Sequence, residues 1–344
     1  MKVGVLTGGG DCPGLNQSIR GIILRSLDYG IEVIGLKNGW AGLIKGLTMS
    51  LDLKTADEII SKGGTILGSS RTNPFKKEDE MVPKCMETFK NIGLDALIAI
   101  GGDDTLGVAN KFYKKGLKIV GVPKTMDNDL SATDYTFGFD SAATIAIDAV
   151  ERLRDTGKSH HRIMVLEVMG RHAGWVALFT GIAGGADWIL IPEQKVNFDE
   201  MCTHLKKVWE RKGYGIVVVS EGIEFSEEDE EDEEEQEKDA FGHIILKKRA
   251  VAVTLEKEIE KRTGIEARSS VIGHMQRGGS PTLFDRILSL RVGVKAVDLI
   301  KEGKFGMMAC LKGNRIEAVP LEQAVAKLKT VDEEWWSFAK VFLK

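Results

Sequence analysis

Two adjacent aspartates follow an apolar run close to residue 100. The stretch GGDDT, Gly101–Thr105, comes directly after ALIAI, which is typical of a buried strand. A hard cation such as Mg²⁺ binds carboxylate oxygens and usually keeps several waters and substrate phosphates as well. Asp103 is therefore our candidate metal ligand, whereas Asp104 places a second negative charge beside it without an obvious purpose. Taken alone, this loop fits a hydrogen-bonded turn equally well.

A second glycine-rich loop follows the first apolar run. In TGGGDCPGLNQS, Thr7–Ser18, three consecutive glycines at Gly8–Gly10 precede a helical pattern. Glycines let backbone N–H groups approach an anion at the start of a helix. The spacing is neither that of the dinucleotide-binding loop GxGxxG nor that of GxxxxGK[ST]. The loop therefore indicates phosphate binding of another kind, or a tight turn that needs small residues.

The densest group of polar residues lies in PKTMDNDLSATDYTFGFDSA, residues 123–142. Lys124, Thr125, Asp127 and Asp129 crowd the end of an apolar run. Lys124 would neutralise charge that develops on a phosphoryl group, and Asp127 would take a proton from a substrate hydroxyl. A lone DND motif is more often a cap or a turn. Beside two phosphate-type loops, we favour the catalytic interpretation.

Further basic residues stand next to other glycine turns. MGRHAGW offers Met169, Gly170 and Arg171 directly after an apolar run, and an arginine fork suits phosphate. Arg162 stands at the start of that run. In EARSSVIGHMQRGGSPT, Arg268 and Arg277 flank His274, and we expect an anion pocket there, although a single histidine is more often structural. These residues complete the candidate set.

The elements that must position these loops are short, strongly apolar runs alternating with helical patterns. VGVLT, EVIGL, ALIAIGG, KIVGVPK, RIMVLEVMG, WILIPE and GIVVVSEG mostly lack clean alternation, which predicts strands buried on both faces. DSAATIAIDAVERLRDTG predicts a helix with Asp140 or Ser141 as its N-cap and an end near Gly157. The alternation predicts an open parallel α/β sheet, whose ligands sit beyond the carboxyl ends of the strands.

Length and composition limit the class of protein. The chain has 344 residues, 43% of them hydrophobic and 28% charged, which is the range of globular proteins with two lobes. The four cysteines are widely spaced and match no metal or disulfide pattern. No apolar run approaches membrane-spanning length, and the strand-like pattern from residue 2 leaves no room for a signal peptide. We therefore expect a cytoplasmic protein without membrane or nucleic-acid partners.

An acidic run conceals the charge of the remaining chain. Residues 227–239 carry eleven acids and one Lys, out of totals of 51 acidic and 47 basic residues, so 40 acidic and 46 basic residues remain elsewhere. The net charge of −4 thus becomes +6 without the run, which suits anionic small molecules. The run contains nothing apolar to bury, and we expect a disordered loop over 226–239.

Together, the motifs resemble the 6-phosphofructokinase family. TGGGDCPGLN, GGDDT, PKTMDNDL, DYTFGFDSA, EVMGRHAGW, VVVSEG and GHMQRGGSPT look like family blocks in family order, from Met1 to about Asp298. The resemblance implies two similar Rossmann-like α/β lobes with parallel sheets and an active site in the cleft between them. We expect a larger, donor-side lobe from residues 1–138 plus 250–305, and a smaller, sugar-side lobe from 139–249 plus 306–344.

The resemblance also implies an activity and roles for the candidate residues. Family members transfer a phosphoryl group to the 1-hydroxyl of fructose 6-phosphate with Mg²⁺, and work as oligomers. By this resemblance, Gly10 binds the donor, Asp103 binds Mg²⁺ and Asp127 is the general base, with Lys124 and Arg171 stabilising charge. The sugar phosphate would contact Thr125, Asp127, Arg162, Met169, Gly170, Arg171, Glu221, Arg268, His274 and Arg277. Arg162 is similar to an arginine that reaches a neighbouring subunit, so we expect a homodimer or homotetramer.

The second aspartate now has an interpretation. Members that use ATP typically have Gly where Asp104 and Lys124 stand, and this chain resembles the pyrophosphate-dependent branch at both positions. Asp104 would place a negative charge where an ATP α-phosphate lies, and like charges in contact cost several kcal/mol. Lys124 would give pyrophosphate a cation. We therefore expect a reversible, pyrophosphate-dependent enzyme of glycolysis.

Three alternatives stay open. The first is an ATP-dependent phosphofructokinase, because RTNPF, Arg71–Phe75, resembles the arginine-bearing loop of ATP users. The second is a non-catalytic sugar-phosphate sensor, which the presence of Asp103, Asp127 and Arg171 disfavours. The third is a lipid or NAD kinase with a similar GGDDT loop, although GHMQRGGSPT and MGRHAGW have no place in that interpretation.

Overall fold

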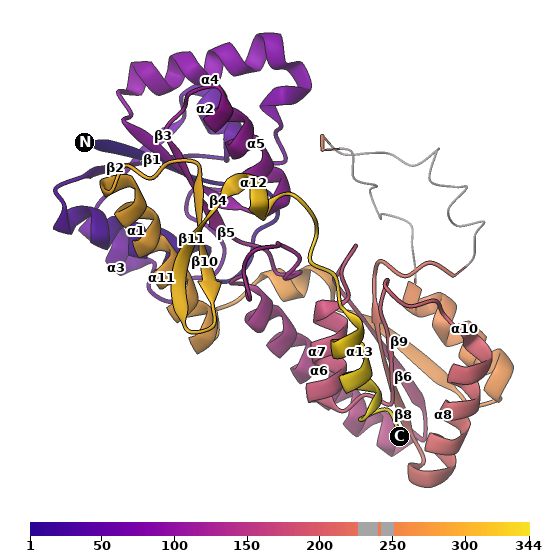
Figure 1. Cartoon of the computed structure of the whole chain (residues 1–344). Coiled ribbons are helices and arrows are strands. Elements are labelled where there is room, and N and C mark those ends of the chain that lie inside the picture. Colours follow the sequence, from indigo (N-terminus) through magenta and orange to yellow (C-terminus); the bar gives the residue numbers. More distant parts are fainter. Residues whose placement is uncertain (226–239, 242–250) are drawn as a thin grey trace.

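The computed structural model describes residues 1–225, 240–241 and 251–344, which form two lobes, each built on its own sheet (Figure 1). The expected acidic loop over 226–239 lies outside the described residues. The parallel α/β class predicted from the alternating runs is confirmed in both lobes, although the sheets differ in size.

The larger lobe contains a seven-stranded sheet. Its strands, in spatial order, are β11 (Arg315–Pro320), β10 (Met307–Lys312), β5 (Ile119–Pro123), β4 (Ala96–Gly101), β1 (Lys2–Thr7), β2 (Glu32–Leu36) and β3 (Thr48–Leu51). The five inner strands are parallel, and the edge strands β3 and β11 run antiparallel to their neighbours. Every residue of β4 and β5 is buried, as expected for a parallel sheet covered on both faces.

Helices cover both faces of this sheet because successive strand residues point to opposite sides. In β4, Ala96, Ile98 and Ile100 pack in one core and Leu97 and Ala99 in the other. The first core is covered by α1 (Leu15–Asp28), α3 (Leu53–Glu58) and α11 (Leu283–Lys301). The second is covered by α2 (Trp40–Lys45), α4 (Glu78–Ile92), α5 (Asp103–Lys114) and α12 (Leu321–Ala324), with the short turn η1 (Pro74–Lys77) beside them.

The smaller lobe contains a four-stranded parallel sheet in the order β7 (Trp188–Leu190), β8 (Gly215–Ser220), β6 (Ile163–Val168) and β9 (Ala267–Val271). One face is covered by α6 (Phe139–His160), α7 (Trp175–Gly184) and α13 (Glu333–Lys340). The other face is covered by α8 (Phe198–Lys212) and α10 (Val251–Thr263), and the turn η3 (Gly273–Arg277) follows β9.

Helix α6 differs from its predicted ends. It begins at Phe139, after Gly138 with φ 100°, and continues past Gly157 to His160. Gly157 is a site of close packing instead of a stop, because an added Cβ would lie 2.8 Å from Cγ of Met164.

The strands do not follow the predicted lobe boundaries. We assigned 306–344 to the smaller lobe, but β10 and β11 join the larger sheet, where Met307 and Met308 pair with Val120 and Gly121. We assigned 250–305 to the larger lobe, but α10 and β9 pack in the smaller one. Apolar runs predict strands without identifying the sheet that each strand joins.

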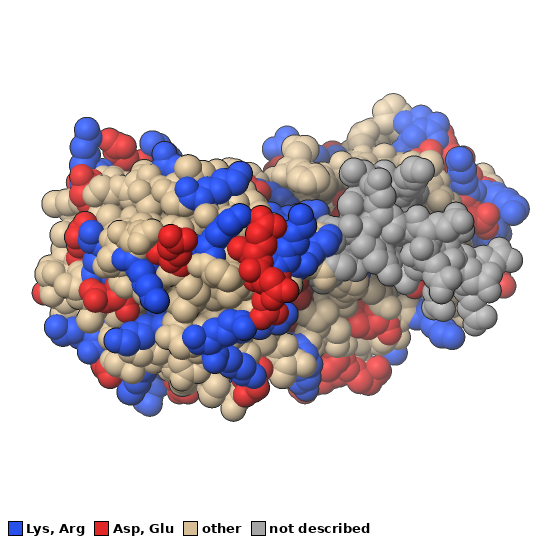
Figure 2. Space-filling view, turned by 90° about the horizontal axis from the view of Figure 1, so that it is seen from above, with Lys and Arg blue, Asp and Glu red and all other residues tan. Residues whose placement is uncertain are grey.

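Two surface properties bear on the expected partners. No helix within the described residues is long and apolar enough to span a bilayer. In the view of Figure 2, acidic and basic side chains are interspersed over the visible face of both lobes.

Candidate active site

The first three candidate loops meet at the carboxyl ends of β1, β4 and β5. The N–H of Gly8 donates to the carbonyl of Ile100 (2.9 Å), and the N–H of Lys124 donates to that of Gly101 (3.0 Å). The buried side chain of Thr105 packs between two of the loops. An added Cβ at Gly8 or Gly101 would lie 2.5 or 2.3 Å from its atoms. These positions therefore require glycine so that the loops can approach one another.

Lys124 lies beneath the glycine loop. Its side chain is only 3% exposed, and its ammonium donates to the carbonyl of Gly10. Burial lowers the pKa of Lys124, and the nearby Arg277 acts in the same direction. A cation is thus held in a dry position against the loop that would bind the phosphoryl donor.

Asp103 and Asp104 occupy the first turn of α5, and both are half-buried. Negative side chains are stabilised at a helix N-terminus, which accounts for how two adjacent carboxylates are tolerated there. Position 104 is therefore part of the same loop system as Gly8–Gly10 and Lys124.

Asp127 follows β5 in a loop with a constrained backbone. Asn128 adopts φ 52°, and its side-chain oxygen accepts from the N–H of Thr136 (3.1 Å). The Thr136 hydroxyl donates to the carbonyl of Thr125 (2.7 Å).

Within the described residues, Oδ1 of Asp127 is buried without a hydrogen-bond partner. Burial raises the pKa of Asp127, while Arg277, Arg171, Lys124 and His172 oppose that rise. A buried carboxylate with a raised pKa is suited to accept a proton.

Three carboxylates are close enough to influence one another. Burial, followed by Asp127 and Asp103, raises the pKa of Asp129 to about 7. A divalent cation bound here would relieve this repulsion. In the part of the chain that the structure describes, no three His, Cys, Asp or Glu side chains are arranged as a complete metal site. The donor set therefore fits Mg²⁺ held by one protein carboxylate together with waters and substrate phosphates.

The smaller lobe contributes residues from the carboxyl ends of β6 and β8. Gly170 has φ 139°, and an added Cβ there would lie 2.9 Å from both the Ala173 carbonyl and the Ser220 hydroxyl. The N–H of Glu221 donates to the carbonyl of Val168 (2.9 Å). Burial, followed by the charge of Asp127, raises the pKa of Glu221 to about 6. A cavity of about 610 Å³ continues from Arg171 along the loops after β7 and β8.

Arg277 joins the two lobes. It ends η3, beside the smaller sheet, and its Nη1 donates to the carbonyl of Asp11 (3.1 Å) in the glycine loop of the larger lobe. The same Nη1 would lie 2.5 Å from a Cβ added at Gly10. Arg277 thus contacts the predicted donor loop, whereas the family resemblance placed it on the sugar phosphate.

We expect Gly10→Ala to displace the Arg277 guanidinium and to lower kcat/KM about tenfold or more, since small misplacements in a reacting site are costly. Gly107→Ala is the matched control, because an added Cβ there meets open space within α5. The control should keep wild-type kinetics and gain up to about 1 kcal/mol of stability. Steady-state kinetics and thermal unfolding of both variants measure the effect, and equal kinetics would contradict the role of this contact.

The structure does not bring every predicted substrate contact to Asp127. Arg162 and Arg268 lie near the amino ends of β6 and β9, and both bind Glu266; the Arg162 contact is 2.9 Å. Arg162 precedes Met169 by about 23 Å of strand, at about 3.3 Å per residue, and Arg268 pairs with Met164, about 16 Å of strand before Met169. His274 is exposed in η3. Within one chain, Arg162 and Arg268 therefore stand apart from the group around Asp127.

Sequence reasoning missed Gln276, whose side chain supports this site. It is fully buried, accepts from the N–H of Met169 (2.8 Å) and donates to the carbonyl of Ala142 (3.2 Å). Gln276 lies between His274 and Arg277 in GHMQRGG, and the interpretation of that motif considered only its two charged residues. The signal available in the sequence was an amide side chain between two charged candidate residues.

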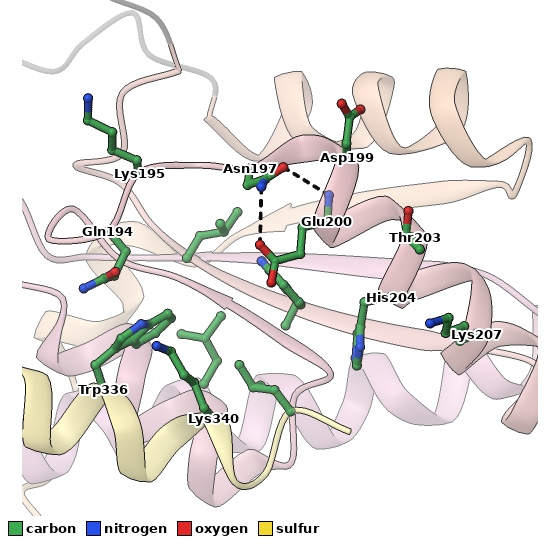
Figure 3. Close-up of a pocket in the computed structure, with 14 residues that line it drawn as sticks. Gln194, Lys195, Asn197, Asp199, Glu200, Thr203, His204, Lys207, Trp336 and Lys340 are labelled. Carbon is green, nitrogen blue, oxygen red and sulfur yellow. Dashed lines mark hydrogen bonds between the residues drawn. The ribbon is translucent and has the colours of Figure 1, made fainter.

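A different cavity lies along the edge strand β7, between α8 and α13, and has a volume of about 700 Å³ (Figure 3). Lys340 and Trp336 extend from α13 on one side, and His204 and Lys207 from α8 on the other. Asn197 caps α8 by accepting from the N–H of Glu200 (3.1 Å). None of the predicted site residues lines this cavity.

Comparison with known proteins agrees with this geometry. Residues 2–300 match the phosphofructokinase family, and the chain belongs to that family. It is 54% identical, over 99% of this chain and 98% of the other, to a pyrophosphate–fructose 6-phosphate 1-phosphotransferase of Dictyoglomus thermophilum.

Two further relatives mark the breadth of the family. The chain is 45% identical, over the full length of both chains, to ATP-dependent 6-phosphofructokinase 3 of Streptomyces coelicolor. Among solved structures, it resembles the T-state phosphofructokinase of Pichia pastoris with a TM-score of 0.85 and 29% identity. That match covers 99% of this chain and 39% of the yeast chain.

Proposed function

We propose that this chain transfers a phosphoryl group from pyrophosphate to the 1-hydroxyl of fructose 6-phosphate, giving fructose 1,6-bisphosphate and phosphate. The observation that carries the choice of donor is the buried ammonium of Lys124 against the Gly10 carbonyl, with Asp104 in the adjoining first turn of α5. The high identity to a pyrophosphate-using relative supports the same choice. The reaction is expected to run in both directions, within glycolysis.

In this proposal, transfer depends on position and charge, as is general for phosphoryl transfer. Asp127 accepts the proton of the attacking hydroxyl. Lys124 and Arg171 stabilise negative charge on the group in transit, and Gly10 and Arg277 orient the donor. On the sugar side, Thr125, Met169, Gly170 and Glu221 line the substrate. We give Arg277 a role toward both the donor and the sugar phosphate, because it extends from the smaller lobe and contacts the donor loop.

Asp103 would hold Mg²⁺ in this proposal. When bound, the ion neutralises charge on the phosphates and bridges them to the protein. Burial is the main cause of the raised pKa of Asp129, and the added repulsion from Asp127 and Asp103 supports a cation at this position.

We also propose that the active form is a homodimer or homotetramer. Arg162 and Arg268 lie at the amino-terminal ends of strands β6 and β9, opposite the end that carries Met169. There they would meet a second copy of the chain. The start of α11 and the adjoining turn expose apolar side chains, with Leu283 78% and Met275 70% exposed. Exposed apolar clusters of this kind commonly mark contact surfaces.

A cytoplasmic location is part of the proposal, supported by four buried cysteines that all remain as free thiols.

An assay with fructose 6-phosphate, Mg²⁺ and either pyrophosphate or ATP tests the donor directly. We expect turnover with pyrophosphate and little with ATP. Turnover with ATP alone would favour the second candidate, an ATP-dependent phosphofructokinase, for which the 45% identity to such an enzyme is the supporting observation. Binding of the sugar phosphate without turnover of either donor would indicate a sensor.

We expect the KM for fructose 6-phosphate to rise as the pH falls below about 6. The pKa of Glu221 is raised to about 6, so its acceptor form dominates above that pH and is lost below it. Glu221→Gln should give a higher KM that varies little between pH 5 and 8. Initial rates against sugar concentration over this range measure the effect, and an unchanged pH profile in the variant would remove Glu221 from the sugar site.

A further inference from the structure

A short segment near the C-terminus connects the two lobes. Residues 328–331 lie between α12, on the larger lobe, and α13, on the smaller lobe (Figure 1). We call them the crossing segment. It contacts both of the loops that carry the proposed chemistry, although it contributes no residue to the site described above.

On the larger lobe, the crossing segment is fastened to the loop that contains Asp127. The ammonium of Lys329 donates to the side-chain oxygen of Asn128 (3.0 Å) and to the carbonyls of Thr133 (3.1 Å) and Asp134 (2.8 Å). Its N–H donates to the carbonyl of Asp129 (2.7 Å). These contacts all fall on the part of the loop that follows Asp127, beginning with the next residue, Asn128. The Asn128 side chain that Lys329 binds also supports Thr136.

On the smaller lobe, the same segment is fastened to the loop that carries Arg171. The N–H of Val331 donates to Oε1 of Glu193 (2.8 Å). The carboxylate of Glu193 also accepts from the N–H of Gly174 (3.0 and 3.1 Å), three residues beyond Arg171. The indole N–H of Trp175 donates to the carbonyl of Lys329 (2.8 Å).

We propose that Lys329 and Glu193 are positioning residues that hold the Asp127 loop and the Arg171 loop in register across the two lobes. Lys329 would fix the loop directly after the base, and Glu193 would fix the start of α7 close to the arginine. This inference rests on the proposed function, because it assumes that Asp127 and Arg171 act together on one substrate.

The surroundings of Lys329 give its role a pH signature. Burial lowers the pKa of Lys329 to about 8, while Asp134 and Asp129 raise it and Lys312 on β10 lowers it. Lys327 and Asp332 line the same cavity of about 750 Å³. The ammonium donates its three hydrogen bonds below pH 8 and loses one donor as the pH rises past that value. The Asp127 loop should therefore loosen, and kcat should fall, on the alkaline side.

The test compares Lys329→Met, Lys329→Arg and the exposed neighbour Lys327→Met as a matched control. For Lys329→Met we expect kcat to fall about tenfold or more, with the KM for pyrophosphate little changed, because the base is misplaced while the donor loop is intact. The variant should also lose the alkaline decline in kcat. Lys329→Arg stays charged and should hold its activity flat to pH 9.5. Lys327→Met should match the wild type.

Glu193→Gln provides an independent measurement if Lys329→Met does not fold. It weakens the anchor beside Arg171, and we expect a higher KM for fructose 6-phosphate with a smaller change in kcat. Wild-type kcat in Lys329→Met, or an alkaline decline that persists in both Lys329 variants, would overturn the inference. Wild-type protein that turns over neither donor would instead contradict the proposed function itself, so the two failures are distinguishable.

Discussion

Asp127→Asn is expected to lower kcat by about 10²–10⁴-fold, the usual contribution of a positioned general base. Asparagine keeps the shape of the side chain but cannot accept the hydroxyl proton. Binding of fructose 6-phosphate, measured by its effect on thermal unfolding, should change much less than kcat. The loss should appear with pyrophosphate in the forward direction and with phosphate in the reverse direction, since one residue carries the proton both ways.

The stability of this variant gives a second and opposite expectation. Burial raises the pKa of Asp127, so the charged form is disfavoured in the folded protein relative to the unfolded chain at neutral pH. Replacing it with a neutral side chain should leave the melting temperature unchanged or raise it. Asp148→Asn is the matched control, because Asp148 lies on the exposed surface of α6, paired with Arg152. A variant that keeps its rate, or loses it only by unfolding, would exclude Asp127 as the base.

The double variant Asp104→Gly with Lys124→Gly is expected to shift donor preference from pyrophosphate towards ATP. A charge-stabilising contact of the kind given by Lys124 is worth about 3 kcal/mol. Its loss should therefore lower kcat/KM for pyrophosphate about 10²-fold, since each 1.4 kcal/mol is a factor of about ten. Removal of the carboxylate at 104 should raise kcat/KM for ATP. The ratio of the two values, measured under identical Mg²⁺ concentrations, reports the change.

The burial of Lys124 requires a further variant. With only 3% of the residue exposed, Lys124→Gly leaves a cavity beneath the glycine loop, which would impair any donor. Lys124→Met fills most of that space without charge, so a loss of pyrophosphate use in this variant reports the charge alone. Single variants at both positions show whether the two effects add. If ATP use fails to rise when Asp104 is removed, its carboxylate is not what excludes the nucleotide.

Much of the fold follows from local patterns in the sequence. The runs that became β1, β4, β5, β6 and β8 are predominantly apolar and lie in parallel sheets covered on both faces. Because parallel strands end at one edge, the loops after β1, β4 and β5 were expected beyond the carboxyl ends of the sheet, and in the structure hydrogen bonds connect them there. The sheet that each strand joins depends on pairing over long sequence separations. No local pattern records that pairing, as the lobe assignments of β9 and β10 illustrate.

The candidate site divides in the same way. Charged residues in the loops that follow strands, such as Asp127, Lys124 and Arg171, were found because phosphoryl transfer requires charged groups at such positions. Gln276, Glu193 and Lys329 were missed because they act through backbone groups of distant segments. Arg162 and Arg268 were found by resemblance, but only the strand register shows that they stand away from Asp127.

The path of the chain has a consequence for how this protein is made. Among the described residues, it passes between the lobes at least three times, and β10, which emerges near residue 310, completes a sheet begun at residue 2. On the ribosome, β5 must wait for nearly two hundred residues before its second neighbour, β10, exists, so the larger sheet cannot be completed until that strand has been made. The larger lobe therefore cannot mature early, and a nascent chain stalled before residue 307 should remain a client of chaperones.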